Sequence, residues 1–413
     1  MRWPRMWKDP SALGLLKGTA VNYLLVERHD DLGPVVDRAR QEGFKVTEAA
    51  SPPAGVTVAE GKWPGVKLSE SGAVDTAAAG PTGNPWVDSN GWKVRLTAAL
   101  HPGTEVWVEA TPKEPRLFTE SYLTAVADAA AYGGRWIISL DKQLAEGIAG
   151  QKTEALETWK KITGAAGFFA ARRDWSDYLP QAAMGIISDF SGQNEFLTHE
   201  TLNLVARTNQ QYRIVLKTKV SESSFSSLRA VLYADAEPPA LELRKQILAF
   251  VQAGGMLITG PKWGELSGVL ATDEHPRYTL RTFGKGRLAV AKADLDDPYL
   301  VANDSVVLIS HRYELLRFWN GGAVGSYFTT APDRKQAVVH MLFYASVRGG
   351  DPSVRVAGQY RTARLWTLDR KAPRSVEMEI QKDAVELHLP PVSQYAAVEL
   401  EGWSPRGSFG RKE

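Results

Sequence analysis

Four acidic side chains in the first half of the chain close short apolar runs. Glu109 ends TEVWVE, Asp141 ends RWIISLD, and Glu27 and Glu48 end two earlier runs. Ligands of parallel α/β folds bind at the carboxyl ends of the strands, so we expect these acids at one edge. Glycoside hydrolysis requires two carboxylates, one to protonate the leaving oxygen and one to attack the sugar or activate water. Glu109 and Asp141 are therefore the candidate catalytic pair, with Glu27 and Glu48 as candidate substrate-binding residues.

The same four acids have a structural interpretation. An acidic side chain at the end of a strand often caps the helix that follows or pairs with an arginine. Glu109 and Asp141 in one open cleft would support chemistry, whereas neutralisation of either by a buried arginine would support a structural role.

The segment from 51 to 102 is rich in Gly, Pro, Ser and Trp, which predicts a long loop with a short helix after Asn90. Indole rings stack on pyranose faces, and Asp and Asn side chains hydrogen-bond to sugar hydroxyls. The candidate saccharide-binding residues of this segment are Trp63, Trp86, Asp88, Asn90 and Trp92. The alternative is that the tryptophans belong to the core and that Asp88 to Asn90 cap the following helix.

Composition excludes several classes of function. Lys and Arg total 49 against 47 Asp and Glu, so we expect no nucleic-acid partner. No apolar run approaches the roughly 18 residues of a membrane span. There is no cysteine, no HExxH motif, no phosphate-binding loop and no GxGxxG after a strand, so we expect no metal and no cofactor. The start, MRWPRMWKDP, lacks a signal-peptide core, which predicts a cytoplasmic protein, or a secreted or periplasmic one if a signal peptide has been removed.

The 413 residues suffice for two or three domains at about 150 residues each. Up to Asp189, apolar runs alternate with segments of helical period, which predicts a parallel α/β domain over residues 1–182. A second α/β domain is expected over 183–324, where the helix Leu241 to Ala253 precedes a strand at Met256 to Thr259. From Gly325 the hydrophobic period becomes two, which predicts an antiparallel β-sandwich over 325–413.

This order of segments resembles family-42 β-galactosidases and the hypothetical glycoside hydrolases related to them. The local match is Leu228 to Gly260, where a strand ending in an acid, a helix and the AGG turn resemble a class I glutamine-amidotransferase-like, flavodoxin-like domain. The resemblance implies a (β/α) barrel, a trimerisation domain of that amidotransferase-like type, and a β-sandwich. It also implies a homo-oligomer, by analogy a trimer.

Three features depart from the family. The chain has no cysteine nucleophile, so the amidotransferase-like domain is expected to serve assembly rather than glutamine hydrolysis. The first 182 residues are fewer than the 200 or so of a complete barrel, which predicts an abbreviated one. The family's Asn-Glu acid/base motif is absent from a barrel strand, because Asn194-Glu195 follows a strand of the second domain.

Two functions follow. One is a glycoside hydrolase-like protein that acts on a saccharide through paired carboxylates in an aromatic-lined cleft. The alternative is a non-catalytic carbohydrate-binding or scaffold protein with a degenerate barrel.

Overall fold

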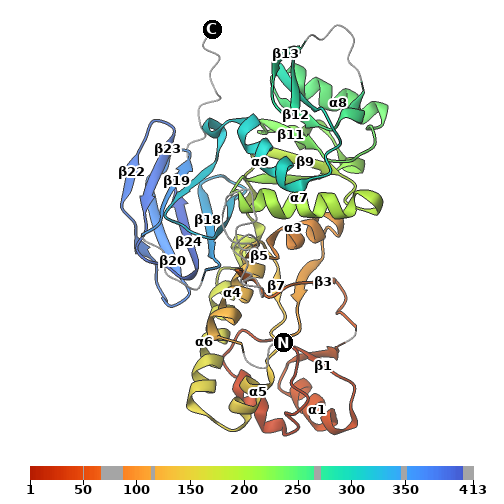
Figure 1. The fold of residues 1–413 in the computed structure, drawn as a ribbon. Helices are drawn as coiled ribbons and strands as arrows, with labels where there is room; N and C mark the ends of the chain where they lie inside the picture. The colour runs from red at the N-terminus through yellow and green to blue at the C-terminus, as the bar shows by residue number, and fades with distance from the viewer. Residues whose placement is uncertain (50, 67–86, 113–116, 265–270, 346–350, 403–413) are drawn as a thin grey trace, which may run out of the picture.

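The computed structural model describes residues 1–49, 51–66, 87–112, 117–264, 271–345 and 351–402. We call residues 1–182, 183–324 and 325–413 the first, second and third regions. The first region lies at the bottom of Figure 1, the second at the upper right and the third at the left. Among the described residues, no helix has both the length and the hydropathy needed to cross a bilayer.

The first region is an open arc of strands with helices on its outside. Its parallel strands form one sheet of two and one of three, in the orders β1-β2 and β3-β6-β7. The strands are β1 (Tyr23–Val26), β2 (Lys45–Glu48), β3 (Val56–Glu60), β6 (Glu105–Glu109) and β7 (Arg135–Trp136), with a small hairpin of β4 (Gly65–Val66) and β5 (Val87–Asp88). The helices are α1 (Gly33–Gln41), α3 (Gly91–Leu100), α4 (Thr119–Ala130), α5 (Lys142–Ala149) and α6 (Thr153–Ala170).

The N-terminal residues join these two sheets. Arg2 forms a parallel bridge with Leu25 of β1, and its backbone N–H donates to Ile138, just beyond β7. The order across the arc is therefore β2, β1, residues 1–3, β7, β6 and β3. No hydrogen-bonded strand pair joins β2 to β3 in the described part of the chain, so the arc remains open there.

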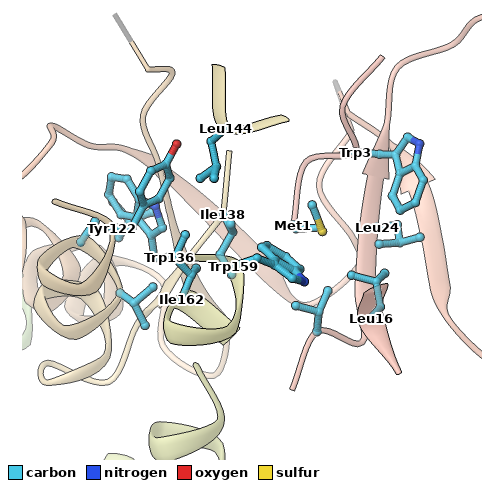
Figure 2. Close-up of a cluster of buried hydrophobic side chains, with 14 of the residues drawn as sticks. Met1, Trp3, Leu16, Leu24, Tyr122, Trp136, Ile138, Leu144, Trp159 and Ile162 are labelled. Atoms are coloured by element: carbon cyan, nitrogen blue, oxygen red, sulfur yellow. The ribbon is translucent and has the colours of Figure 1, made fainter. Parts of the chain in front are cut away.

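The outer face of the arc carries the largest hydrophobic cluster. Trp3 lies beside Leu24, and Trp136 beside Tyr122 of α4 (Figure 2). Since successive residues of a strand face opposite sides, the neighbours Leu25, Trp107 and Ile137 form a separate small cluster on the inner face. Alternate residues of each strand thus face the helices on the outside of the arc and its inner face.

The second region is one seven-stranded sheet in the order β10-β9-β11-β12-β15-β14-β13. The first five of these strands are parallel, and β14 and β13 add antiparallel pairs at one edge. Helices α7 and α9 bury one face of the sheet and α8 the other. The elements are β9 (Met184–Ser188), α7 (Glu195–Arg207), β10 (Tyr212–Leu216), β11 (Ala230–Tyr233), α8 (Leu241–Gln252), β12 (Met256–Thr259), β13 (Ala271–Glu274), β14 (Tyr278–Phe283), β15 (Gly286–Ala291) and α9 (Pro298–Ile309).

The third region consists of two antiparallel sheets with one buried cluster between them. The four-stranded sheet has the order β16-β19-β23-β22, and the six-stranded sheet β21-β20-β24-β18-β17-β8. The strands are β8 (Leu179–Pro180), β16 (Leu316–Trp319), β17 (Val324–Thr330), β18 (Gln336–Phe343), β19 (Ser353–Ala357), β20 (Thr362–Thr367), β21 (Arg374–Ser375), β22 (Met378–Ile380), β23 (Ala384–His388) and β24 (Gln394–Glu401). Two of them, β8 and β16, come from outside the range 325–413.

The architecture is thus a mixed α/β fold with several sheets, as the alternation of apolar runs predicted. One expectation was wrong in detail, because the segment from 51 to 102 is more than a loop with a short helix. It contributes β3, whose backbone pairs along its whole length with β6.

Candidate functional site

The inner face of the arc carries acidic side chains at the carboxyl ends of its strands. Glu109 lies two residues beyond Trp107 and so points to the same inner face. Glu60, at the end of β3, is the register partner of Glu109 on the neighbouring strand. Paired residues of adjacent strands point to the same side, and the strands are about 4.8 Å apart. Glu60 and Glu109 therefore form a carboxylate pair that the sequence analysis did not identify.

Arg2 holds Glu109 from the opposite direction. Its Nε donates to Glu109 Oε1 at 2.8 Å, and its Nη2 donates to the same oxygen. The two side chains are 27% and 24% exposed, so this ion pair is only partly shielded from water. No hydrogen bond from the described residues reaches Oε2 of Glu109. One carboxylate oxygen is thus fixed and the other is available.

The other two strand-end acids of the early sequence point to different faces. Glu27 lies two residues beyond Leu25 and shares the inner face with Glu109. Glu48 lies two residues beyond Val46, which packs against the outer cluster, so Glu48 belongs to the outer face. Both side chains are exposed.

Asp141 occupies a different environment from Glu109. It is the N-cap of α5, and its Oδ1 accepts from the backbone N–H of Leu144 at 3.0 Å. Its Oδ2 accepts from the hydroxyl of Tyr122 at 2.9 Å and from the N–H of Leu117 at 3.2 Å. The side chain is buried, and its two oxygens are both engaged, Oδ1 at the start of α5 and Oδ2 with Tyr122 of α4 and the backbone of Leu117. This is the helix-capping arrangement described above as the alternative for strand-end acids.

Two of the candidate tryptophans pack against neighbouring rings. Trp63 contacts Tyr122 and Trp136 edge to face, with 5.1 Å between ring centroids in both cases. Trp92 lies against His199 of α7 at 5.3 Å and joins the cluster of the second region. Trp86 lies outside the described residues. Among the described residues, Trp63 and Trp92 therefore belong to two different hydrophobic clusters and line no common cleft.

Asn90 and Asp88 organise the segment that follows β3. The side chain of Asn90 accepts from the N–H of Lys62 and donates to its carbonyl, each at 2.8 Å. It also donates to Asp128 of α4 at 2.8 Å. The carboxylate of Asp88 lies 3.5 Å from Lys62 Nζ. Asn90 occupies the N-cap position of α3, as the alternative above has it, but its side chain makes no capping hydrogen bond there.

No group of three or more His, Asp or Glu side chains in the described residues is arranged to hold a metal ion. Comparison of the sequence with protein-family models and with curated proteins finds no match. Solved structures do match. α-L-Fucosidase isoenzyme 2 from Paenibacillus thiaminolyticus superposes with a TM-score of 0.52 at 12% identity, over 90% of this chain and 71% of the fucosidase.

The fold is glycoside hydrolase-like. A rhamnosidase from Novosphingobium sp. PP1Y matches with a TM-score of 0.51 at 13% identity, over 91% of this chain and 39% of its own. A GH42 β-galactosidase, Gan42B, matches with a TM-score of 0.44 at 11% identity, over 72% of this chain and 60% of its own. This glycoside hydrolase-like chain thus spans less than two thirds of the rhamnosidase and of the β-galactosidase.

The signal for Glu60 was present in the sequence. VTVAE, like VNYLLVE, is a short apolar run that ends in an acid. This run lies among Gly, Pro and Ser residues, which favoured the interpretation of the whole segment as a loop. Arg2 has no such signal, since its pairing with Glu109 depends on the N-terminal residues entering the arc between β1 and β7.

Proposed function

We propose that this glycoside hydrolase-like protein hydrolyses a saccharide at the inner face of the arc, with Glu109 and Glu60 as the two carboxylates. The register pairing of these two residues on neighbouring parallel strands supports the proposal most directly. The fold of the fucosidase and the rhamnosidase is consistent with saccharide chemistry.

The two carboxylates would have different roles. Glu109 is held by Arg2 on one oxygen, so its second oxygen has a fixed position from which to attack or stabilise an anomeric carbon. Glu60 is exposed and has room to protonate the leaving oxygen and then to activate water. Carboxyl groups about 5–5.5 Å apart belong to retaining glycosidases, and neighbouring strands place such groups near that spacing. We therefore propose retention of configuration.

The catalytic pair expected from the sequence, Glu109 and Asp141, is thereby revised in this proposal. Glu109 stays, Glu60 takes the second role, and Asp141 is assigned to the start of α5. Glu27 stays a proposed substrate-binding residue, since it shares the inner face. We also propose that the second region is a flavodoxin-like domain that serves trimer assembly and that the third region is a β-sandwich. These assignments rest on the sheet order and on the family resemblance.

The test compares the wild type with Glu109→Gln and Glu60→Gln on a panel of oligosaccharides and aryl glycosides, with released sugar measured by mass spectrometry. Loss of a general acid or of a nucleophile should lower turnover by about 10²- to 10⁴-fold. Glu60→Gln should retain more activity on aryl glycosides with good leaving groups, because these need no proton, whereas Glu109→Gln should lose activity on every substrate. Glu48→Gln, an exposed strand-end acid on the outer face, is the matched control and should behave as wild type.

The second candidate is a non-catalytic saccharide-binding protein. Asp141 is fully engaged as a helix cap and Glu109 is paired with an arginine, as a structural interpretation of both acids predicts. Binding of a sugar without release of product by the folded wild type would establish this second function and refute the first.

A further inference from the structure

Helix α9 of the second region is buried on one side and presents an uncharged side to the surface. Val301, Ala302 and Ile309 belong to the hydrophobic cluster between this helix and the sheet. At 3.6 residues per turn, another set of residues occupies the opposite side of the helix. These residues are Tyr299, Leu300, Asn303, Val306 and Val307. Val307 is 54% exposed and Tyr299 39%.

The outer side of α9 has no charged residue. The one charged residue of the helix, Asp304, is buried, and its carboxylate accepts from Arg277 Nε at 2.6 Å. Helix α8 also has 12 residues and covers the other face of the same sheet, yet Glu242 and Lys245 are among its exposed residues. A surface helix normally carries charged and polar side chains on its outer side. The apolar outer side of α9 therefore indicates a contact with another surface.

The acidic end of α9 is its start. Asp297 is the N-cap, and the exposed Asp296 precedes it. Asp294 is 3.5 Å from Lys262, and Lys292 is exposed nearby. Three carboxylates against two ammonium groups leave one negative charge at this end. Among the described residues, no ion pair includes Asp296.

The basic end of α9 is the segment that follows it. Arg312 is exposed and forms no ion pair with a described residue, and its guanidinium lies 4.9 Å from the ring of its neighbour Tyr313. Glu314 is paired with Arg317 and accepts or shares a proton with His311. Two guanidinium groups against one carboxylate leave one positive charge at this end.

An apolar helix with opposite charges at its two ends is complementary to itself. If two copies of α9 pack antiparallel about a two-fold axis, Asp296 of each copy lies near Arg312 of the other. Such a contact uses the same surface on both chains. Asn303, midway between Tyr299 and Val307, then lies closest to the axis. This charge arrangement selects a second copy of the chain as the occupant.

The size of the surface predicts a weak contact. At 1.5 Å per residue, α9 is about 18 Å long, which is short for the roughly 800 Å² that each partner buries in a typical stable complex. Phe196, 72% exposed, lies at the start of α7, which packs beside α9 (Figure 1) and would extend the contact. We therefore expect a dissociation constant in the micromolar range.

We propose that the outer side of α9 binds the same side of α9 in a second copy of this chain, antiparallel and about a two-fold axis. A two-fold contact gives an even number of chains, which is two by itself or six in combination with the trimer proposed above. The contact includes no residue of the inner face of the arc, so it does not depend on saccharide hydrolysis.

The first test is sedimentation of the full chain over about 1–100 μM. We expect a species of two or six chains, and Val307→Glu should weaken the two-fold association tenfold or more, because it buries a charge in the contact. Leu241→Glu is the matched control: it removes a 70% exposed apolar residue from α8, on the other face of the sheet, and should not change the association.

The second test uses the absence of cysteine from the chain. Asn303→Cys places one thiol close to the proposed axis, so a short bifunctional maleimide should link two chains. Ala249→Cys places an exposed thiol on α8 and should give no such product.

Charge reversal tests the orientation. Asp296→Arg and Arg312→Asp should each weaken the association about five- to tenfold, and the double variant should restore it, because opposite charges again face each other. The proposal is overturned if the wild type stays at one or three chains, if a folded Val307→Glu variant associates as the wild type does, or if the double variant is no better than the single ones. Three chains would leave the trimer proposal standing, and turnover measured in Val307→Glu keeps both questions separate from hydrolysis.

Discussion

The hydroxyl of Tyr344, one residue beyond β18, donates a hydrogen bond of 2.7 Å to Asp128 of α4. The other oxygen of Asp128 accepts from the backbone N–H and the side-chain amide of Asn90, each at 2.8 Å. One buried carboxylate therefore ties the third region to two helices of the first. Burial raises the pKa of Asp128 to about 6, although the hydrogen bonds from Tyr344 and Asn90 act in the opposite direction.

We predict that Asp128 makes the folded protein less stable as the pH rises from about 4 to about 6. Its pKa is higher in the folded chain than the unfolded value of 3.8, so the folded chain binds more protons in this window. The stabilisation is complete below pH 4 and is lost as the pH passes 6, by at most about 3 kcal/mol. The measurement is the free energy of unfolding in urea between pH 4 and 7, for the wild type and for Asp128→Asn.

The comparison isolates this carboxyl from all other titrating groups. The free energy of unfolding of Asp128→Asn minus that of the wild type should rise between pH 4 and pH 6, whatever the difference between the two proteins at pH 7. Parallel curves for the two proteins would show that Asp128 does not titrate there.

Asp141→Ala should destabilise the protein without a direct effect on chemistry. The substitution removes the cap of α5 and leaves the hydroxyl of Tyr122 without its acceptor, at a cost of about 2–3 kcal/mol. Asp141→Asn keeps an acceptor oxygen and should cost less. Urea denaturation gives the stability, and turnover per folded molecule should match the wild type. A loss of turnover in a stable Asp141→Asn protein would return Asp141 to the catalytic pair.

Lys217→Met should cost about 3 kcal/mol or more. The ammonium of Lys217 bridges Asp189 and Asp235 at the carboxyl edge of the second sheet, 2.7 Å from Asp235. The side chain of Asp235 is fully buried, so the substitution would leave its charge unpaired. Adding Asp235→Asn removes that charge and should recover part of the loss in thermal unfolding. A double variant no more stable than Lys217→Met would contradict this explanation.

Two identical substitutions of glycine should have opposite effects. A Cβ on Gly91, at the start of α3, would lie 2.2 Å from the ring of Tyr132, so Gly91→Ala should cost about 1–3 kcal/mol. Gly164 in α6 is exposed with nothing within 4 Å of such a Cβ, so Gly164→Ala should stabilise by up to about 1 kcal/mol. The free energy of unfolding of both variants, measured by chemical denaturation, tests this prediction. A loss of stability in Gly164→Ala would be evidence against the open surroundings of Gly164.

Elements with a clean hydrophobic period were predictable from the sequence. The expected helix Leu241 to Ala253 and strand Met256 to Thr259 are α8 and β12. The alternation around Met378 and Leu387 marks β22 and β23. In these segments the apolar residues fall at the buried positions and the polar residues at the exposed ones, so the residue types alone indicate the element.

The candidate site was less predictable for two physical reasons. An acid at the end of a strand serves helix capping and catalysis equally well, so the sequence could not separate Asp141 from Glu109. The partner of Glu109 was hidden because the apolar residues of β3 lie among turn-forming ones. Arg2 and Glu109 are 107 positions apart in the chain, so no local sequence pattern indicates that they pair.

The short strand β8 has a consequence for how the protein is made. Leu179 and Pro180 connect the first region to the second, yet they pair with Thr330 and Thr329 of β17, and Gln181 bonds to the side chain of Thr330, 149 positions later. On a ribosome, the first 182 residues emerge well before β17 exists. Their final strand therefore stays unpaired until the whole second region and the first residues of the third have been translated. A fragment that ends near residue 182 should therefore keep an unsatisfied edge, however well its own core packs.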